Sequence, residues 1–356
     1  MARHTIGPRP FGRRAARTAG TSRMCVPVAL TPPIKPMLAE ARRDLPPEGA
    51  LPGGLVFEPK PDGFRAIVFA RPGLVMVQSR RGADLTASFP DIAEAAAAVA
   101  EEDLVLDGEL VVAHEGRLDF IELQHRARRR GRNAIQAASE KPAHLVVFDV
   151  LQLAGAELLE LPYSGRRGRL EDLFARDTLK APFTLCPATT DRRQAQDWLD
   201  PSWGTVGIEG VVVKGQSQPV LLDQRAWVKV RSRTTVEAII ASVTGSVDNP
   251  TTLLLGRYDA DGRLRLVART TPLPTAMRRD LASRLDRGGP EHPWTGRRFS
   301  AGWGTQAELH HQPVRPELVA EFLADTAVDA GRFRHPVVFQ RVRDDLAPDD
   351  IPLMER

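Results

Sequence analysis

Between residues 55 and 231 the spacing of apolar and polar positions changes repeatedly, which predicts a mixture of short strands and helices. Runs that are apolar or alternating, and that Gly, Pro or Asp bounds, predict strands at Leu55–Phe57, Ala66–Phe69, Leu74–Gln78, Leu104–Val112, Leu145–Leu153, Gly210–Lys214 and Trp227–Val230. Helical spacing predicts Asp91–Glu101, Asp119–Arg130, Arg167–Phe174 and Arg192–Leu199. Because several strands follow one another without a helix between them, we expect an α+β fold with antiparallel sheets and flanking helices.

The pattern changes after the boundary that we expect near Ser232–Thr235. Strands are predicted at Val236–Thr244, Thr252–Tyr258 and Leu264–Thr270, separated by Asp-Asn-Pro and Asp-Gly turns. Helices are predicted at Thr275–Arg284 and Pro316–Thr326, and two more strands around Gly331–Arg343. About five strands in about 120 residues predict a small Greek-key barrel such as an OB-fold. The expected domains are therefore residues 33–232 and 233–356.

Length and charge narrow the classes of protein. A chain of 356 residues suggests two domains. The formal net charge of +4 permits nucleic acid as a partner without requiring it. The two cysteines, Cys25 and Cys186, form no CxxC pair, so a zinc site is not expected and a reducing cytoplasm fits. The longest apolar run, Ala95–Ala100, is too short to span a membrane.

The first 32 residues contain Arg and Pro, no acidic residue and little periodicity. A mitochondrial transit peptide can have this composition. We favour a disordered basic tail outside the fold.

One lysine, Lys60, stands between apolar runs in "VFEPKPDGFRAIVF" (Val56–Phe69). Lysine can act as a covalent nucleophile, but losing its proton at pH 7 costs roughly 4–5 kcal/mol. Burial, nearby cations or a metal ion must offset that cost. The turn Pro61–Gly63 would hold Lys60 at the rim of a sheet, although a turn with an exposed lysine is the commoner outcome. Because no GxxxxGK[ST] or GxGxxG loop is present, nucleotide chemistry would need another kind of site.

Other residues near these strands are candidates only in combination. Glu58 shares a strand face with Lys60. Glu109, inside the apolar run "LVLDGELVV", needs a partner for its carboxylate. Arg65 and Arg80 are forked donors that suit phosphate oxygens, yet such arginines are commonly solvated surface charges. Phe148 alone is typical of a core aromatic residue.

Six blocks occur in order along the chain: "KPDGFR" (60–65), "QSRRG" (78–82), "LDGEL" (106–110), "VVFDV" (146–150), "IEGVVVK" (208–214) and "WVKVR" (227–231). Their order and spacing resemble the covalent nucleotidyltransferase superfamily, and most closely the ATP-dependent DNA ligases. The resemblance runs from "PPIKPMLA" (32–39) to "RHPVVFQRVRDDLAP" (334–348). The short two-domain form is similar to the stand-alone bacterial ligases of the C type.

The resemblance implies a three-step reaction. A lysine attacks the α-phosphorus of ATP and releases pyrophosphate, AMP passes to the 5′-phosphate of a DNA nick, and the 3′-hydroxyl displaces AMP. Lys60 would be the nucleophile. Its partners would be nicked duplex DNA and DNA-repair proteins, with the enzyme a monomer in the bacterial cytoplasm near the nucleoid.

The resemblance also assigns roles to the candidates. Glu58 would bind the adenine amino group and Phe148 would stack on the adenine ring. Glu109 would bind the ribose or a metal ion, and Glu209 would hold Mg²⁺ (or Mn²⁺). Lys214 and Lys229 would face the α-phosphate and lower the pKa of Lys60. Further nucleotide contacts are expected from Arg65, Arg80 and Arg225.

Two positions depart from the family pattern. Arg231 ends "WVKVR" where a lysine is usual, and Leu346 ends "RDDL" where the last block usually has a lysine that helps to orient pyrophosphate. Arg341 and Arg343 could partly replace that charge. Arg225 is the nearest match to an arginine that usually precedes "WxK".

The run "HRARRRGR" (125–132) is a candidate DNA contact, through Arg126, Arg128, Arg129 and Arg130. A solvated basic face is an equally good interpretation. Two other functions stay open from the sequence. One is an RNA ligase or a GTP-using capping-type nucleotidyltransferase. The other is a nick-binding protein with weakened catalysis, which Leu346 favours.

Overall fold

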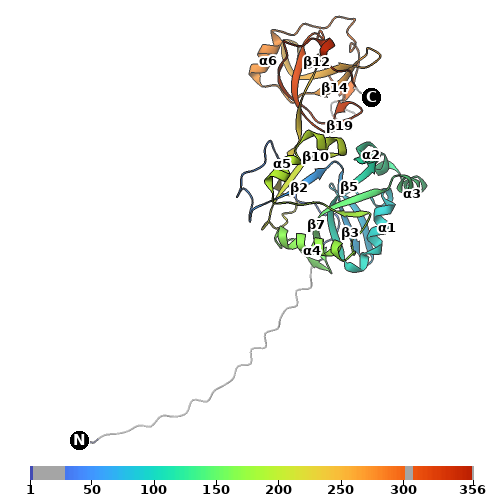
Figure 1. Ribbon diagram of the computed structural model, residues 1–356, viewed down its shortest axis with the longest axis vertical. Coiled ribbons are helices and arrows are strands. Elements are labelled where there is room, and N and C mark those ends of the chain that lie inside the picture. Colours follow the sequence, from blue (N-terminus) through green and yellow to red (C-terminus); the bar gives the residue numbers. More distant parts are fainter. Residues whose placement is uncertain (3–28, 301–307, 355–356) are drawn as a thin grey trace.

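The computed structural model describes residues 1–2, 29–300 and 308–354. The predicted basic tail lies almost wholly outside these ranges. Two bodies are visible, a larger one built from the first two-thirds of the chain and a smaller barrel that follows it (Figure 1).

Two sheets form the larger body. One contains β4 (Leu74–Ser79), β3 (Phe64–Arg71), β5 (Leu104–His114), β7 (Ala143–Leu153) and β8 (Ala156–Glu157) in that order, with β6 (Arg117–Leu118) and β9 (Phe183–Leu185) at its margins. The other runs β1 (Leu38–Arg42), β11 (Arg225–Arg231), β10 (Ile208–Gly215) and β2 (Leu55–Pro61). Only the pairs β1–β11 and β7–β9 are parallel. The predicted antiparallel α+β architecture is therefore confirmed.

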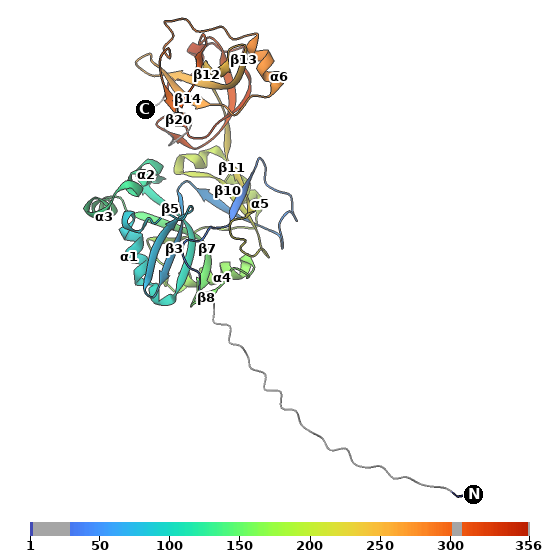
Figure 2. The same ribbon diagram turned by 180° about the vertical axis from the view of Figure 1, so that it is seen from behind.

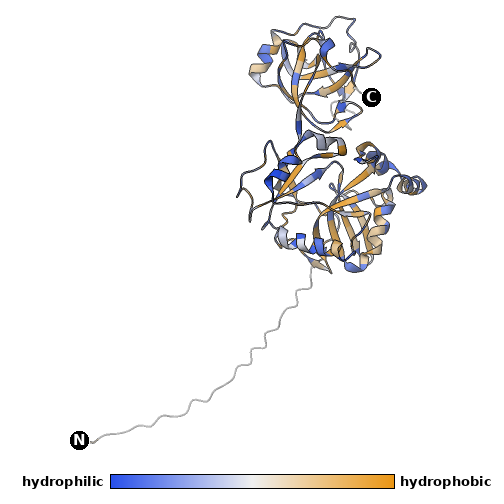
Figure 3. Ribbon diagram, in the orientation of Figure 1, coloured by the Kyte–Doolittle hydropathy of each residue, from blue (hydrophilic) through white to orange (hydrophobic). Residues whose placement is uncertain are grey.

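Alternation along β3 explains how the sheets pack. Ala66 and Val68 face one core beneath the helices, while Ile67 and Phe69 face a second core that also contains Trp227 of the other sheet. Successive side chains of a strand point to opposite faces, so one strand supplies two cores. The strands are the most hydrophobic parts of the ribbon (Figure 3).

Helices flank both sheets. They are α1 (Pro90–Ala98), α2 (Phe120–Arg128), α3 (Gly131–Glu140), α4 (Tyr163–Ala175) and α5 (Arg192–Asp197), with the 3₁₀ turns η1 (Thr86–Ser88), η2 (Ala100–Glu102) and η3 (Pro201–Val206). Asp119 caps α2 by accepting from the Glu122 amide. The predicted helix at Asp119–Arg130 ends earlier, and α3 was not predicted. Arg129 and Arg130 separate the two helices, and Gly131 begins α3 with φ of +54°, which favours glycine.

The smaller body is the predicted OB-fold barrel. Its strands run β14 (Leu264–Arg269), β13 (Asn249–Tyr258), β12 (Arg233–Ser246), β18 (Val319–Asp325) and β21 (Val338–Val342), with β17 (Gln312–Pro313) beside β12. A bridge between Thr270 and Val337 links the two ends of this order. The remaining elements are α6 (Thr275–Ala282), β15 (Phe299–Ser300), β16 (Glu308–Leu309), β19 (Val328–Asp329), β20 (Arg332–Phe333) and η4 (Pro348–Asp350).

The predicted helix at Pro316–Thr326 is wrong, because most of this segment forms β18. Ala320, Phe322 and Ala324 are buried at every second position, which is the period of a strand. The residues are good helix formers, but pairing with β12 on one side and β21 on the other outweighs that preference.

The barrel follows the larger body directly, with only Ser232 between β11 and β12. The view from behind shows the barrel standing over the end of β10 and β11 (Figure 2). In the described ranges, no helix is long and apolar enough to cross a membrane.

Candidate active site

A β-bulge places Lys60 against Glu209. Pro59 pairs with Val211 and Pro61 with Ile208, so Lys60 alone opposes two residues of β10. Bulges re-aim side chains, and this one directs the Glu209 carboxylate at the Lys60 ammonium, with which it forms an ion pair. The second bulge residue is Gly210, with φ of +147°. A Cβ there would lie 2.1 Å from the Val230 carbonyl oxygen, so only glycine fits.

The charges around Lys60 favour its protonated form. Burial lowers the pKa of Lys60, but the carboxylates of Glu209 and Glu109 outweigh burial and raise it. The Arg231 cation acts to lower this pKa, but in the protein alone the two carboxylates outweigh it. The Lys60 side chain is 21% exposed.

The pKa values of the two carboxylates are shifted in opposite directions. Burial raises the pKa of Glu109 to about 7 despite the opposing charges of Lys60 and Arg65. Burial also acts to raise the pKa of Glu209, but Lys60 and Arg231 hold it below its ordinary value. Burial, followed by the charges of Arg231 and Lys60, lowers the pKa of Lys229. Lys229 and Arg231 are thus two cations of β11 that share the electrostatic environment of Lys60.

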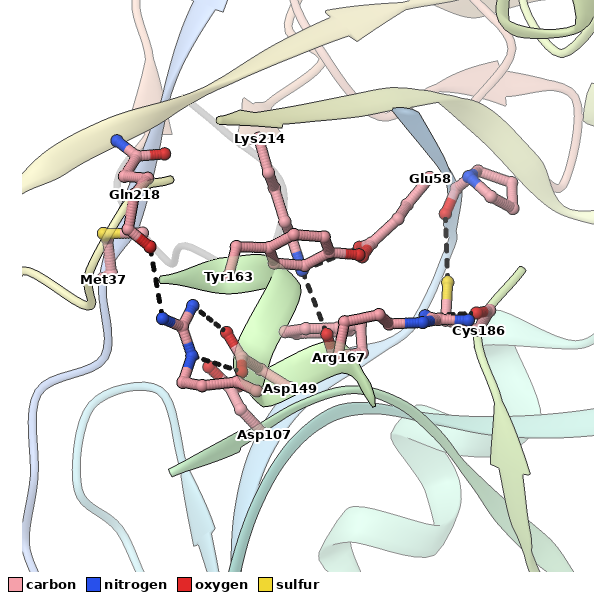
Figure 4. A network of polar contacts seen from close by, with 12 residues as sticks. Met37, Glu58, Asp107, Asp149, Tyr163, Arg167, Cys186, Lys214 and Gln218 are labelled. Carbon is pink, nitrogen blue, oxygen red and sulfur yellow. Dashed lines mark hydrogen bonds and ion pairs between the residues drawn. The ribbon is translucent and has the colours of Figure 1, made fainter. Parts of the chain in front are cut away.

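Glu58 lies deeper, in a buried polar network (Figure 4). Its carboxylate accepts a 2.7 Å hydrogen bond from the Tyr163 hydroxyl and pairs with Lys214 at 2.8 Å. The Lys214 ammonium also donates to the Phe148 carbonyl at 3.1 Å.

This network places Lys214 beside the two expected adenine contacts, Glu58 and Phe148. The sheet register pairs Lys214 with Val56, four residues and about 13 Å along β2 from Lys60. Lys214 therefore bonds Glu58 in this structure and does not lie beside Lys60.

Arg65, Phe148 and Trp227 form an aromatic and cationic corner between the two sheets. The Arg65 guanidinium lies 5.4 Å from the Phe148 ring and 5.1 Å from the Trp227 ring. Its Nε donates to Asp107 at 2.9 Å, so the charge is balanced within the protein. Phe148 is half-buried.

The two remaining nucleotide candidates are exposed. Arg80 follows β4 and is close enough to lower the pKa of Lys229. Arg225 begins β11, four residues and about 13 Å along the strand from Lys229. Their roles stay predictions.

Arg126 does not fit the predicted DNA contact. Its side chain is fully buried, pairs with Asp91 at 2.8 Å and donates to the Lys141 carbonyl at 2.6 Å. It is a structural residue that holds α2 against α1. Arg128 and Arg130 are exposed, and Arg129 is half-exposed and paired with Glu122 at 2.9 Å.

The carboxylates near Lys60 suit a divalent cation that binds together with phosphates. In the described part of the chain no group of three or more acidic, His or Cys side chains could by itself hold a metal. Glu209 Oε2 is buried there without a hydrogen-bond partner, and Glu109 is the second carboxylate acting on Lys60. Mg²⁺ is commonly bound by one or two carboxylates plus substrate phosphates, so these residues fit that mode.

Sequence reasoning missed several residues around the site. Tyr163 gave no signal. Asp325 and His335 of the barrel reach Arg231, and Arg334 pairs with Asp62. Only the block that begins at Arg334 pointed toward this region.

Leu346 and the arginines expected to compensate for it have other partners. Leu346 packs against a barrel core that contains Ile239 and Trp294. Arg341 pairs with Glu321 at 3.0 Å, and Arg343 pairs with Glu237 at 3.0 Å.

Comparison with known proteins identifies the family. The model for the ATP dependent DNA ligase domain matches residues 36–231, and that for the ATP dependent DNA ligase C terminal region matches residues 248–346. The chain belongs to the ATP-dependent DNA ligases. It is 33% identical to DNA ligase C2 of Mycolicibacterium smegmatis over 88% of this chain and 91% of that protein. It is 32% identical to DNA ligase C of Mycobacterium tuberculosis, covering 89% and 92%.

Solved structures agree on the fold of this ligase. A Lig E DNA ligase covers 86% of this chain and 99% of its own, with 15% identity and a TM-score of 0.51. The ligase Pmar-Lig covers 87% of this chain and 68% of its own, with 18% identity and a TM-score of 0.56. At these identities the likeness concerns the fold alone.

Proposed function

We propose that this ligase seals nicks between a 5′-phosphate and a 3′-hydroxyl in duplex DNA, with Lys60 carrying AMP as a phosphoramidate. The single observation that carries the proposal is the placement of Lys60, a partly exposed amine held by Glu209 in a β-bulge. In the first step a bond forms between Nζ and the α-phosphorus, and the bond to pyrophosphate breaks. AMP then passes to the 5′-phosphate, and the 3′-hydroxyl displaces it.

Lys60 must lose its proton before it attacks. Burial favours the neutral amine, whereas Glu209 and Glu109 oppose deprotonation. Positive charge close to the amine therefore favours reaction, and Arg231, with Lys229 beside it, supplies that charge within the protein. Glu209 and Glu109 would hold Mg²⁺, which when bound supplies further positive charge to the carboxylates and phosphates.

The adenine is proposed to stack on Phe148, which packs edge-to-face against Trp227. The buried Glu58 carboxylate is proposed as the acceptor for an exocyclic amino group. Lys214 would then act from the base end of the nucleotide, because its ammonium lies 4.6 Å from the Phe148 ring. Arg65, Arg80 and Arg225 stay proposed contacts to the ribose and phosphates.

DNA is proposed to contact the α2–α3 region through the exposed or half-exposed arginines Arg128, Arg129 and Arg130. These side chains can neutralise backbone phosphates without reading sequence.

Intact-mass spectrometry of the purified protein with ATP and Mg²⁺ tests the proposal. We expect one AMP adduct on the wild type and none on Lys60→Ala. The matched control is Lys180→Ala, which removes an exposed lysine from the same body. An adduct that persists in Lys60→Ala would refute the assignment. Labelled GTP in place of ATP should give no adduct. A nicked duplex should yield sealed product with the wild type and with Lys180→Ala, but not with Lys60→Ala.

A further inference from the structure

The two oxygens of the Glu209 carboxylate have different surroundings. Oε1 contacts Lys60, whereas Oε2 is buried and has no hydrogen-bond partner among the described residues. The Nε of Arg231 lies 3.8 Å from Oε2 and likewise has no hydrogen-bond partner in that part of the chain. At this distance the pair lacks a hydrogen bond, which a small movement of Arg231 would create.

The barrel prevents that movement by holding the other end of Arg231. Arg231 Nη1 lies 3.0 Å from Asp325 Oδ2, and Nη2 lies 3.3 Å from His335 Nε2. His335 Nδ1 lies 2.9 Å from the same Asp325 oxygen. Asp325 supplies the negative charge that draws Arg231 toward the barrel.

A second contact fixes the same segment of the barrel beside Lys60. Arg334, adjacent to His335, pairs with Asp62 in the turn that follows the lysine. The Arg334 guanidinium also lies 3.8 Å from the centre of the Phe120 ring of α2. The segment from Asp325 to His335 therefore acts on the surroundings of Lys60 in two ways. It holds Arg231, which lies next to Glu209, and it contacts the turn that follows Lys60.

We propose that Asp325 is a positioning residue for lysine adenylylation, because by holding Arg231 it leaves Glu209 to Lys60. The inference rests on the proposed role of Lys60. Without the Asp325 charge, Arg231 turns to Oε2 of Glu209 and competes with Lys60 for the carboxylate. The amine then loses the contact that aims it. Sealing of a nick that already carries AMP does not use Lys60 as a nucleophile, so that step does not need this contact.

The arrangement explains why arginine suits position 231. A guanidinium presents Nε to Glu209 and both Nη groups to the barrel, so one side chain serves three partners. The single ammonium of a lysine cannot reach acids on opposite sides. The departure from the usual lysine is thus matched by Asp325 and His335.

The test separates the two chemical steps in Asp325→Asn. Single-turnover formation of the Lys60–AMP adduct from ATP should slow about tenfold, the size expected from a modest loss of alignment. Sealing of a synthetic nick that carries a 5′-adenylate should stay within about twofold of the wild type. Asp325→Glu, which restores the charge, should recover part of the adenylylation rate.

Asp261→Asn is the matched control. It removes an exposed acid of the barrel, which lies 3.7 Å from Arg263 and far along the chain from the bulge, and should change neither step. If Asp325→Asn lowers both steps in parallel, the residue merely docks the barrel and the inference fails. Unchanged adenylylation overturns it as well.

Two further outcomes are distinguishable. If a thermal melt shows that Asp325→Asn does not fold, Arg231→Lys replaces it in the same two assays. We then expect slower adenylylation with unchanged sealing of the adenylated nick. A parallel loss in both steps, or no loss in either, would overturn the inference. A wild type that forms no adduct would refute the proposed function, whereas a wild type and variant that react equally refute only the role of Asp325.

Discussion

The buried pair between Lys214 and Glu58 provides a sharp stability prediction through Lys214→Met. The two side chains are 1% and 3% exposed and 2.8 Å apart. Methionine keeps the length of the chain among the Phe148, Trp227 and Tyr163 rings, but it leaves Glu58 with the Tyr163 hydroxyl as its one remaining partner in the described network. Removing one member of a buried ion pair costs about 3–5 kcal/mol. We expect the unfolding temperature of the larger body to fall by roughly 6–20 °C.

A double-mutant cycle gives the assay its control. Glu58→Gln alone should destabilise by a similar amount, because it strands the Lys214 charge. The double variant Glu58→Gln/Lys214→Met removes both charges and should recover most of the loss, with a coupling free energy above about 2 kcal/mol. Differential scanning calorimetry measures all four proteins at one pH.

An exposed ion pair of similar length supplies the comparison. Lys35 and Asp223 are 3.0 Å apart, with side chains 75% and 58% exposed. Lys35→Met should change stability by less than about 1 kcal/mol. If the two single losses at positions 58 and 214 simply add in the double variant, the reasoning from a coupled buried pair is refuted.

Three further predictions concern the site and its surroundings. Burial raises the pKa of Glu109 to about 7, so the folded protein holds a proton that the unfolded chain has lost, and stability falls as pH rises from about 4.5 to 7. In metal-free buffer the free energy of unfolding of Glu109→Gln should exceed that of the wild type by up to about 3 kcal/mol above pH 7. Near pH 4 the two values should be equal, and urea titrations at each pH will measure both. Gly210→Ala should cost at least about 2 kcal/mol in the same titrations and slow adenylylation, because its Cβ meets the opposite strand; wild-type behaviour would contradict the bulge. Arg126→Ala should lower the free energy of unfolding by about 3 kcal/mol, because it leaves Asp91 unpaired. Arg128→Ala should keep the melting temperature of the wild type. It should lower the number of ions released on binding nicked DNA by about one, as measured from the salt dependence of binding by fluorescence anisotropy.

Local patterns predicted most of the first body because its strands are apolar and bounded by turn residues. The alternation rule correctly put Glu58 on the strand that carries Lys60. It could not tell which residues of β10 and β11 would face each of them, because that depends on register. The bulge at Glu209 and Gly210 shifts the register, and it decides that Glu209, and not Lys214, meets Lys60.

The errors have physical causes as well. Helix-forming residues misled the prediction for β18, where pairing on both sides decides the structure. The run "HRARRRGR" consists mostly of arginine, yet one of these arginines is buried against Asp91 and others are exposed. Only packing distinguishes them, because helical position fixes which arginine faces α1.

The contacts between the two bodies were beyond reach of any local pattern. Asp62 and Arg334 are separated by 272 positions, and Arg231 and Asp325 by 94. None of these four residues differs in type from a solvated surface charge. They acquire a role because β11 runs into β12 with one residue between, which carries the barrel over the bulge. Within the described residues, the last sequence block supplies Leu346 to the barrel core and binds Arg341 and Arg343 to barrel acids. The positive charge that acts on Lys60 therefore comes from β11, through Arg231 and Lys229. The barrel acts on the lysine through Asp325 and His335, which contact Arg231.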